Sequence, residues 1–65
     1  MLFGTDGYFA KRRALRVLSE LQYEAFKKGW HAVANEFYEA MEILRSKKQT
    51  TAYWDGLEEQ IRAEA

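Results

Sequence analysis

Cysteine and proline are both absent from this chain of 65 residues. Without cysteine the chain can form no disulfide, and it offers no thiolate as a metal ligand or a nucleophile. Without proline, its helices can run uninterrupted. Glycine occurs only four times, at positions 4, 7, 29 and 56, and three of these positions lie near expected ends of structural elements.

The chain also lacks net charge, because its 10 Lys and Arg side chains balance its 10 Asp and Glu side chains. This balance argues against a globally basic nucleic-acid-binding protein. No apolar run approaches the ~20 residues that a membrane span needs, and the first residues lack the charged and apolar regions of a signal peptide. We therefore expect no membrane partner and a cytoplasmic location.

The groups that carry most enzyme chemistry are scarce. His31 is the one histidine, and neither serine lies at a suitable sequence spacing from it for nucleophilic catalysis. Glu36, Glu39 and Glu42 recur at steps of three residues, but no Asp- and Gly-containing loop accompanies them as a Ca²⁺ site requires. We therefore expect no catalytic residue, metal, cofactor or small-molecule substrate, and no enzymatic activity.

Apolar residues are abundant and recur at helical spacing. Hydrophobic residues make up 48% of the chain and aromatic residues 15%, which favours a folded domain over disorder. Two stripes at steps of three and four residues meet near Gly29, whose backbone readily takes the left-handed conformation that ends a helix. The first stripe is Ala14, Leu18, Leu21 and Ala25, and the second is Trp30, Val33, Phe37, Ala40 and Leu44. This pattern predicts an antiparallel helical hairpin.

A third, shorter stripe follows the hairpin. It consists of Tyr53, Trp54, Leu57 and Ile61, and a threonine at position 50 or 51 can cap the helix that carries it. We therefore predict an all-α fold: one small domain over residues 1–65, with an N-terminal arm (1–7) and helices at about 8–28, 30–46 and 51–63. Thr5 or Asp6 is the expected cap of the first helix.

The second predicted helix has the widest apolar arc, roughly 160° at 100° per residue. That width predicts contact with the first helix on one side, and with the third helix or another subunit on the other. Ala34 and Tyr38 partly resemble the helix-turn-helix of a tetratricopeptide repeat, but Gln22 and Met41 depart from its pattern. The resemblance therefore indicates two helices that pack closely through small residues, and not membership of that family.

An antiparallel hairpin brings the start of the first helix beside the end of the second. This gathers seven cations, which we call the basic pole: Lys11, Arg12, Arg13, Arg16, Arg45, Lys47 and Lys48. Cations in the first turns of a helix oppose its dipole, and the like charges of Arg12 and Arg16 cost on the order of 0.3 kcal/mol more. A local conflict of this kind often marks function.

Three interpretations of the basic pole stay open. It binds the phosphates of a nucleic acid, it docks an acidic protein surface, or it is a solvated end neutralised by acidic residues of the third helix. The carboxylates in question are Asp55, Glu58 and Glu59.

The aromatic residues exceed what so small a core is expected to hold. We expect packing or self-association from four of them: Trp30, Phe37, Tyr38 and Trp54. The predicted function is a non-catalytic interaction or regulatory module, acting on a protein partner or on itself as a homo-oligomer, through its hydrophobic face and the basic pole. The alternative is a nucleic-acid-binding regulator that uses the same pole.

Overall fold

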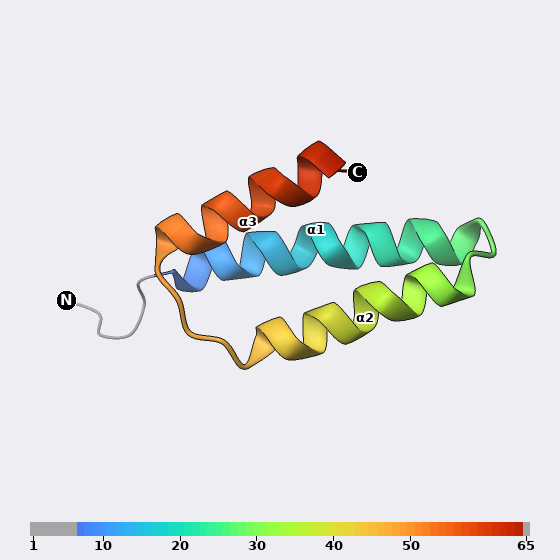
Figure 1. Cartoon of the computed structure of the whole chain (residues 1–65), viewed down its shortest axis with the longest axis horizontal. Coiled ribbons are helices and arrows are strands. Elements are labelled where there is room, and N and C mark those ends of the chain that lie inside the picture. The colour runs from blue at the N-terminus through green and yellow to red at the C-terminus, as the bar shows by residue number, and fades with distance from the viewer. Residues whose placement is uncertain (1–6, 65) are drawn as a thin grey trace.

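The computed structural model describes residues 7–64. It contains three helices, α1 (Tyr8–Lys27), α2 (His31–Arg45) and α3 (Thr51–Glu64), and no strand in that part of the chain. The first two helices form the predicted antiparallel hairpin, and α3 runs beside the N-terminal part of α1 (Figure 1). The all-α fold class is therefore confirmed, with helix ends within one residue of their predicted positions.

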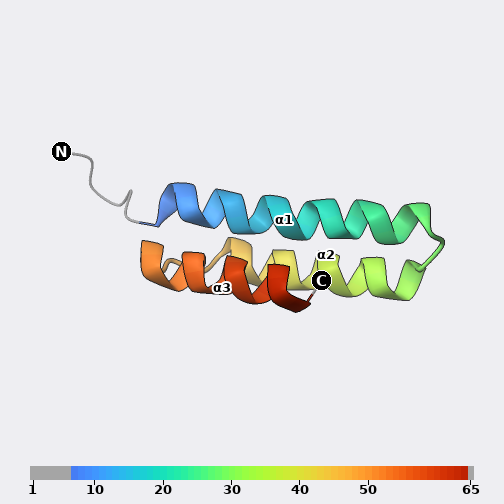
Figure 2. The same cartoon turned by 90° about the horizontal axis from the view of Figure 1, so that it is seen from above.

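The central helix is α1, which packs against both of the others, whereas the backbones of α2 and α3 do not approach each other. In the view of Figure 1, α2 and α3 flank α1 on either side. The view turned by 90° shows that α2 and α3 also share one layer, with α1 in the other layer (Figure 2). The three helices thus make an open V with α1 at its apex. The second helix therefore meets the third only through side chains, as where Leu44 packs against the cluster around Trp54. The alternative, contact with another subunit, stays a prediction.

The position of α3 follows from the packing of one side chain. Trp54 is only 1% exposed and lies against Ala10 and Ala14 of α1, with Leu44 and Leu57 packed around this cluster. The two alanines leave room for an indole, which buries a large apolar area at a single position. Small residues also lie in the hairpin, where Ala25 and Ala34 are buried, as the sequence predicted.

The turn of the hairpin is a Schellman motif centred on Gly29, which has a φ of 79°. The amide of Gly29 donates to the carbonyl oxygen of Phe26 at 3.0 Å, and the amide of Trp30 donates to that of Ala25 at 2.8 Å. These bonds satisfy carbonyls at the end of α1 that have no intrahelical partner. Trp30 is consequently the N-cap of α2 and not its first helical residue.

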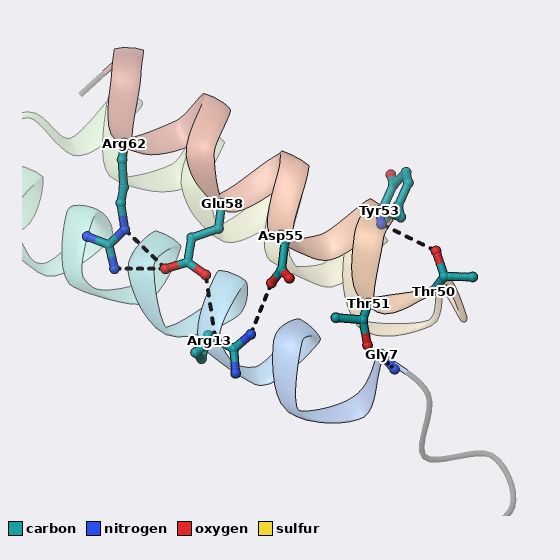
Figure 3. A network of polar contacts seen from close by, with 8 residues as sticks. All are labelled: Gly7, Arg13, Thr50, Thr51, Tyr53, Asp55, Glu58 and Arg62. Atoms are coloured by element: carbon teal, nitrogen blue, oxygen red, sulfur yellow. Dashed lines mark hydrogen bonds and ion pairs between the residues drawn. The ribbon is translucent and has the colours of Figure 1, made fainter.

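At the opposite end, Gly7 precedes α1 with a φ of 81°, and its amide donates to Oγ1 of Thr51 at 3.0 Å (Figure 3). Oγ1 of Thr50 accepts a hydrogen bond from the amide of Tyr53 at 3.3 Å, so the predicted threonine cap of α3 is present. The expected caps of α1, Thr5 and Asp6, lie outside the described residues, and of the predicted arm 1–7 the structure describes only Gly7. None of the helices in the described part is long and apolar enough to cross a membrane.

Candidate functional site

The seven cations of the basic pole separate into a lysine group and an arginine group. Lys11, Lys47 and Lys48 line a cavity beside Gly7 and Trp54, between the start of α1 and the segment that joins α2 to α3. The four arginines line a different hollow, a groove of about 740 Å³ between α1 and α2. The lysines and the arginines therefore require separate explanations.

Two members of the lysine group, Lys11 and Lys47, make contacts that hold the fold together, whereas Lys48 only lines the cavity. Nζ of Lys11 donates to the carbonyl oxygen of Lys47 at 2.7 Å and also to the carbonyl oxygen of Arg45. These carbonyls lie at the C-terminal end of α2, where intrahelical partners run out and a positive charge is favourable. The ammonium of Lys47 lies 5.8 Å from the ring centroid of Tyr53, within the range of a cation–π contact.

Arg13 is neutralised inside the fold, as the third interpretation of the basic pole anticipated. Its Nη2 lies 3.0 Å from Oδ1 of Asp55, and its Nε lies 3.7 Å from Oε1 of Glu58. Glu58 also accepts from Arg62, one turn further along α3, at 2.9 Å (Figure 3). Arg13 thus ties α1 to α3 through an ion-pair network.

Arg12 and Arg16 differ from Arg13 in this respect. Neither makes an ion pair with any residue in the described range 7–64, and Arg12 lies over the ring of Tyr8, 5.8 Å from its centroid. Arg45 enters the same groove from α2 and pairs with Glu42 on its own helix. Of the four guanidinium groups that line the groove, those of Arg13 and Arg45 have a carboxylate partner, and those of Arg12 and Arg16 have none among residues 7–64.

The remaining lining of this groove is largely apolar and aromatic. Leu15 and Met41 are mostly buried between the helices, whereas Phe9 and Tyr38 are exposed. Within the described range 7–64, no carboxylate is among the lining residues. We call this hollow the arginine groove, and its full lining is Phe9, Arg12, Arg13, Leu15, Arg16, Ser19, Gln22, Tyr38, Met41 and Arg45. Guanidinium groups beside aromatic rings suit a ligand with both carboxylates and apolar groups.

The four aromatic residues that the sequence suggested for packing or self-association lie in different places. Trp54 is in the core, and Phe37 is half-buried in a second groove between α2 and α3. Tyr38 is exposed in the arginine groove, and Trp30 is exposed at the hairpin turn. The sequence reasoning missed Leu15 and Met41 as lining residues because they read only as members of the hairpin core.

Among residues 7–64, the side chains with catalytic or metal-binding chemistry do not come together in one site. The ring of His31 contacts Phe26 edge-on, with centroids 5.6 Å apart, and Ser19 lines the arginine groove. In the described part of the chain no group of three His, Asp or Glu side chains is placed to hold a metal ion. Comparison with protein-family models, curated proteins and solved structures found no match to this chain. Its function is therefore inferred from its own residues and their geometry.

Proposed function

We propose that the protein is a non-catalytic interaction module that holds an acidic, amphipathic segment of a partner protein in the arginine groove. One observation carries the proposal. Among residues 7–64, Arg12 and Arg16 line this groove without an ion-pair partner, and no carboxylate joins them in the lining. Guanidinium forks bind carboxylates in bidentate geometry, so a partner that brings carboxylates would complete both.

The apolar part of the groove narrows the class of partner. Leu15 and Met41 offer an apolar floor, and a thioether adapts its shape to whatever packs against it. Phe9 and Tyr38 add exposed aromatic area on either side, as is common at protein interfaces. A helix with apolar residues along one face and carboxylates at its edges fits such a lining.

A nucleic acid is the competing ligand for the same arginines. Its phosphates would bind Arg12 and Arg16, and its bases would stack on the exposed rings. Two features weigh against a nucleic acid. The net charge of zero gives no general attraction for a polyanion, and the carboxylate of Glu42 beside Arg45 repels phosphates. The dependence of affinity on salt separates the two ligands.

Self-association is part of the proposal and rests on the second groove. That groove has a volume of about 390 Å³ and lies in the open V between α2 and α3. Its apolar lining is Leu18, Leu21, Phe37, Ala40 and Ile61. Leu18 is already buried, whereas Leu21, Phe37, Ala40 and Ile61 are half-buried. A second copy that covers these four side chains would bury their remaining exposed apolar area, which favours association. Sedimentation equilibrium of the wild type and of Phe37→Asp tests this; a wild-type monomer at all concentrations would contradict it.

The arginine groove is tested with a designed helical peptide that carries leucines on one face and glutamates beside them. Its affinity is measured by calorimetry for the wild type, for Arg12→Gln/Arg16→Gln, and for Arg13→Gln. We expect the double variant to bind at least about tenfold more weakly, a loss of 1.4 kcal/mol or more. Arg13→Gln is the control within the same lining, since the guanidinium of Arg13 is already paired with Asp55 and Glu58.

Two results would overturn this assignment. One is an equal loss of affinity in Arg13→Gln and in the double variant, because the arginine groove would then have no special role. The other is tighter binding of a mixed-sequence single-stranded oligonucleotide than of the peptide, with a steep decrease as salt rises. The second result would make the protein a nucleic-acid-binding regulator.

A further inference from the structure

The end of the hairpin opposite the basic pole exposes aromatic side chains around two lysines. Tyr23 is 64% exposed, Phe26 52% and Trp30 55%, although each is an apolar or largely apolar side chain. Lys27 and Lys28 lie between them in the sequence and at the turn itself. We call this surface the hairpin tip, and its residues are Tyr23, Phe26, Lys27, Lys28, Trp30 and Val33.

The hairpin tip projects beyond the rest of the molecule. Helix α3 stops well short of the turn in both views (Figures 1 and 2). A Cβ added at Gly29 would meet nothing within 4 Å, so the surroundings of the turn are open. The Schellman hydrogen bonds nevertheless hold its backbone in one conformation, because the amides of Gly29 and Trp30 are both engaged. The exposed rings are thus presented on an ordered turn.

Each lysine of the hairpin tip lies beside an aromatic ring. Nζ of Lys28 is 4.9 Å from the ring centroid of Trp30, and Nζ of Lys27 is 5.4 Å from that of Tyr23. Glu24 is the one carboxylate between positions 23 and 33. The surface therefore combines amphipathic rings with a local excess of positive charge.

This combination fits an anionic lipid surface better than the other candidate occupants. A dimer joined at the tip would bring Lys27 and Lys28 of both copies together. Their positive charges would repel each other, because Glu24 is the one nearby carboxylate that each copy supplies. Tryptophan and tyrosine favour the membrane–water interface, and lysines beside them attract anionic headgroups.

We propose that the hairpin tip docks on anionic lipid surfaces, with Trp30, Phe26 and Tyr23 at the level of the headgroups. Lys27 and Lys28 then contact the headgroup phosphates and carboxylates, and their alkyl stems cover the rings. The chain lies on such a surface without crossing it. The expectation of no membrane partner followed from the absence of a run long enough to span, and interfacial docking requires only a few side chains.

The experiment measures flotation of the full chain with phosphatidylcholine vesicles, with and without phosphatidylserine, at low salt. We expect binding that depends on phosphatidylserine. Lys27→Gln/Lys28→Gln should weaken it about 30-fold, and Trp30→Ala should weaken it about tenfold or more. Circular dichroism of each variant verifies the fold, which is expected to persist because these side chains lie outside the core.

Two control variants separate the hairpin tip from general charge and from the arginine groove. Lys47→Gln/Lys48→Gln removes the same charge from an adjacent lysine pair at the opposite end of α2 and should keep nearly full binding. Arg12→Gln/Arg16→Gln should also keep vesicle binding, although it loses the acidic peptide. The failure of one proposal is thereby distinguishable from the failure of the other.

Tryptophan emission locates the contact. Trp54 is buried and Trp30 is exposed, so a blue shift on addition of vesicles is expected in the wild type and absent in Trp30→Phe. Three results would overturn the proposal: no dependence on phosphatidylserine, equal losses in the two lysine-pair variants, or an unshifted wild-type emission under conditions where the protein floats with the vesicles.

Discussion

Nζ of Lys11, in the first turn of α1, lies 2.7 Å from the carbonyl oxygen of Lys47, just beyond the end of α2. It also donates to the carbonyl oxygen of Arg45. A cation here opposes the dipole of α1 but complements the negative end of α2, and it satisfies carbonyls that α2 leaves without partners. The apparent conflict at Lys11 is thus resolved by a tertiary contact, whereas Arg12 and Arg16 have no such contact among residues 7–64.

The first prediction concerns this contact between helices. Lys11→Met keeps the apolar stem and removes the ammonium, so the carbonyls of Arg45 and Lys47 lose their donor. We expect the free energy of unfolding to decrease by about 1–2 kcal/mol. Urea denaturation followed by circular dichroism measures it. Lys48→Met is the control and should change stability by less than about 0.5 kcal/mol; equal effects of both substitutions would contradict the assigned role of Lys11.

The second prediction concerns the ion pair of Arg13 with Asp55. Both side chains are about half exposed, so solvent and salt screen their attraction. A double-mutant cycle with Arg13→Gln and Asp55→Asn should give a coupling of about 0.2–1 kcal/mol, which decreases as salt is added. A coupling that stays constant from low to high salt would argue for a less solvated pair than the structure shows.

The third prediction concerns the core. Trp54→Ala should lower the free energy of unfolding by about 3–5 kcal/mol, because it empties the space against Ala10 and Ala14. That loss is comparable with the total stability expected at roughly 0.05–0.15 kcal/mol per residue. Thermal unfolding should show a lost or strongly lowered transition. Ile43→Ala, which removes an exposed side chain of α2, should leave the transition nearly unchanged; similar effects of both would refute this packing.

The hairpin and the third helix were predictable because the spacing of apolar residues along the sequence reflects local helical structure. Stripes at steps of three and four residues, a glycine between two of them and a threonine before the third define each element and its apolar face. Periodicity does not determine which neighbouring helix each apolar face packs against, because that depends on tertiary packing. Trp54 packs against α1 because the small side chains of Ala10 and Ala14 leave room for its indole. Ala10 lies outside the apolar stripe that the sequence spacing identified.

The candidate site was predictable to a similar degree. An antiparallel hairpin must bring the arginines near residue 12 to the end of the second helix, so the clustering follows from topology. The difference between Arg13 and Arg16 depends on position around α1. Arg12 and Arg16 lie about 40° apart, whereas Arg13 is displaced from Arg12 by about 100° and reaches the carboxylates of α3. That distinction requires the location of α3, which the sequence pattern did not provide.

The fourth prediction compares one substitution at two glycines. Gly29 has a φ of 79°, and a Cβ there meets nothing within 4 Å, so Gly29→Ala adds backbone strain without a clash. We expect a loss of about 1 kcal/mol in the free energy of unfolding. Gly56 lies within α3, and its Cβ also meets open space. Gly56→Ala should therefore stabilise the protein by about 0.5–1 kcal/mol, since alanine loses less backbone entropy in a helix.

The same substitution at Gly7 extends this comparison to a crowded position. Gly7 shares the positive φ of Gly29, but a Cβ there would overlap the carbonyl oxygen of Gln49 and touch the indole of Trp54. Gly7→Ala should therefore cost more than Gly29→Ala, because steric overlap is added to backbone strain. Urea denaturation of the three variants should rank their stabilities as Gly56→Ala, then wild type, Gly29→Ala and Gly7→Ala. A reversed order of Gly7→Ala and Gly29→Ala would show that the start of α1 does not pack against the segment before α3 in solution.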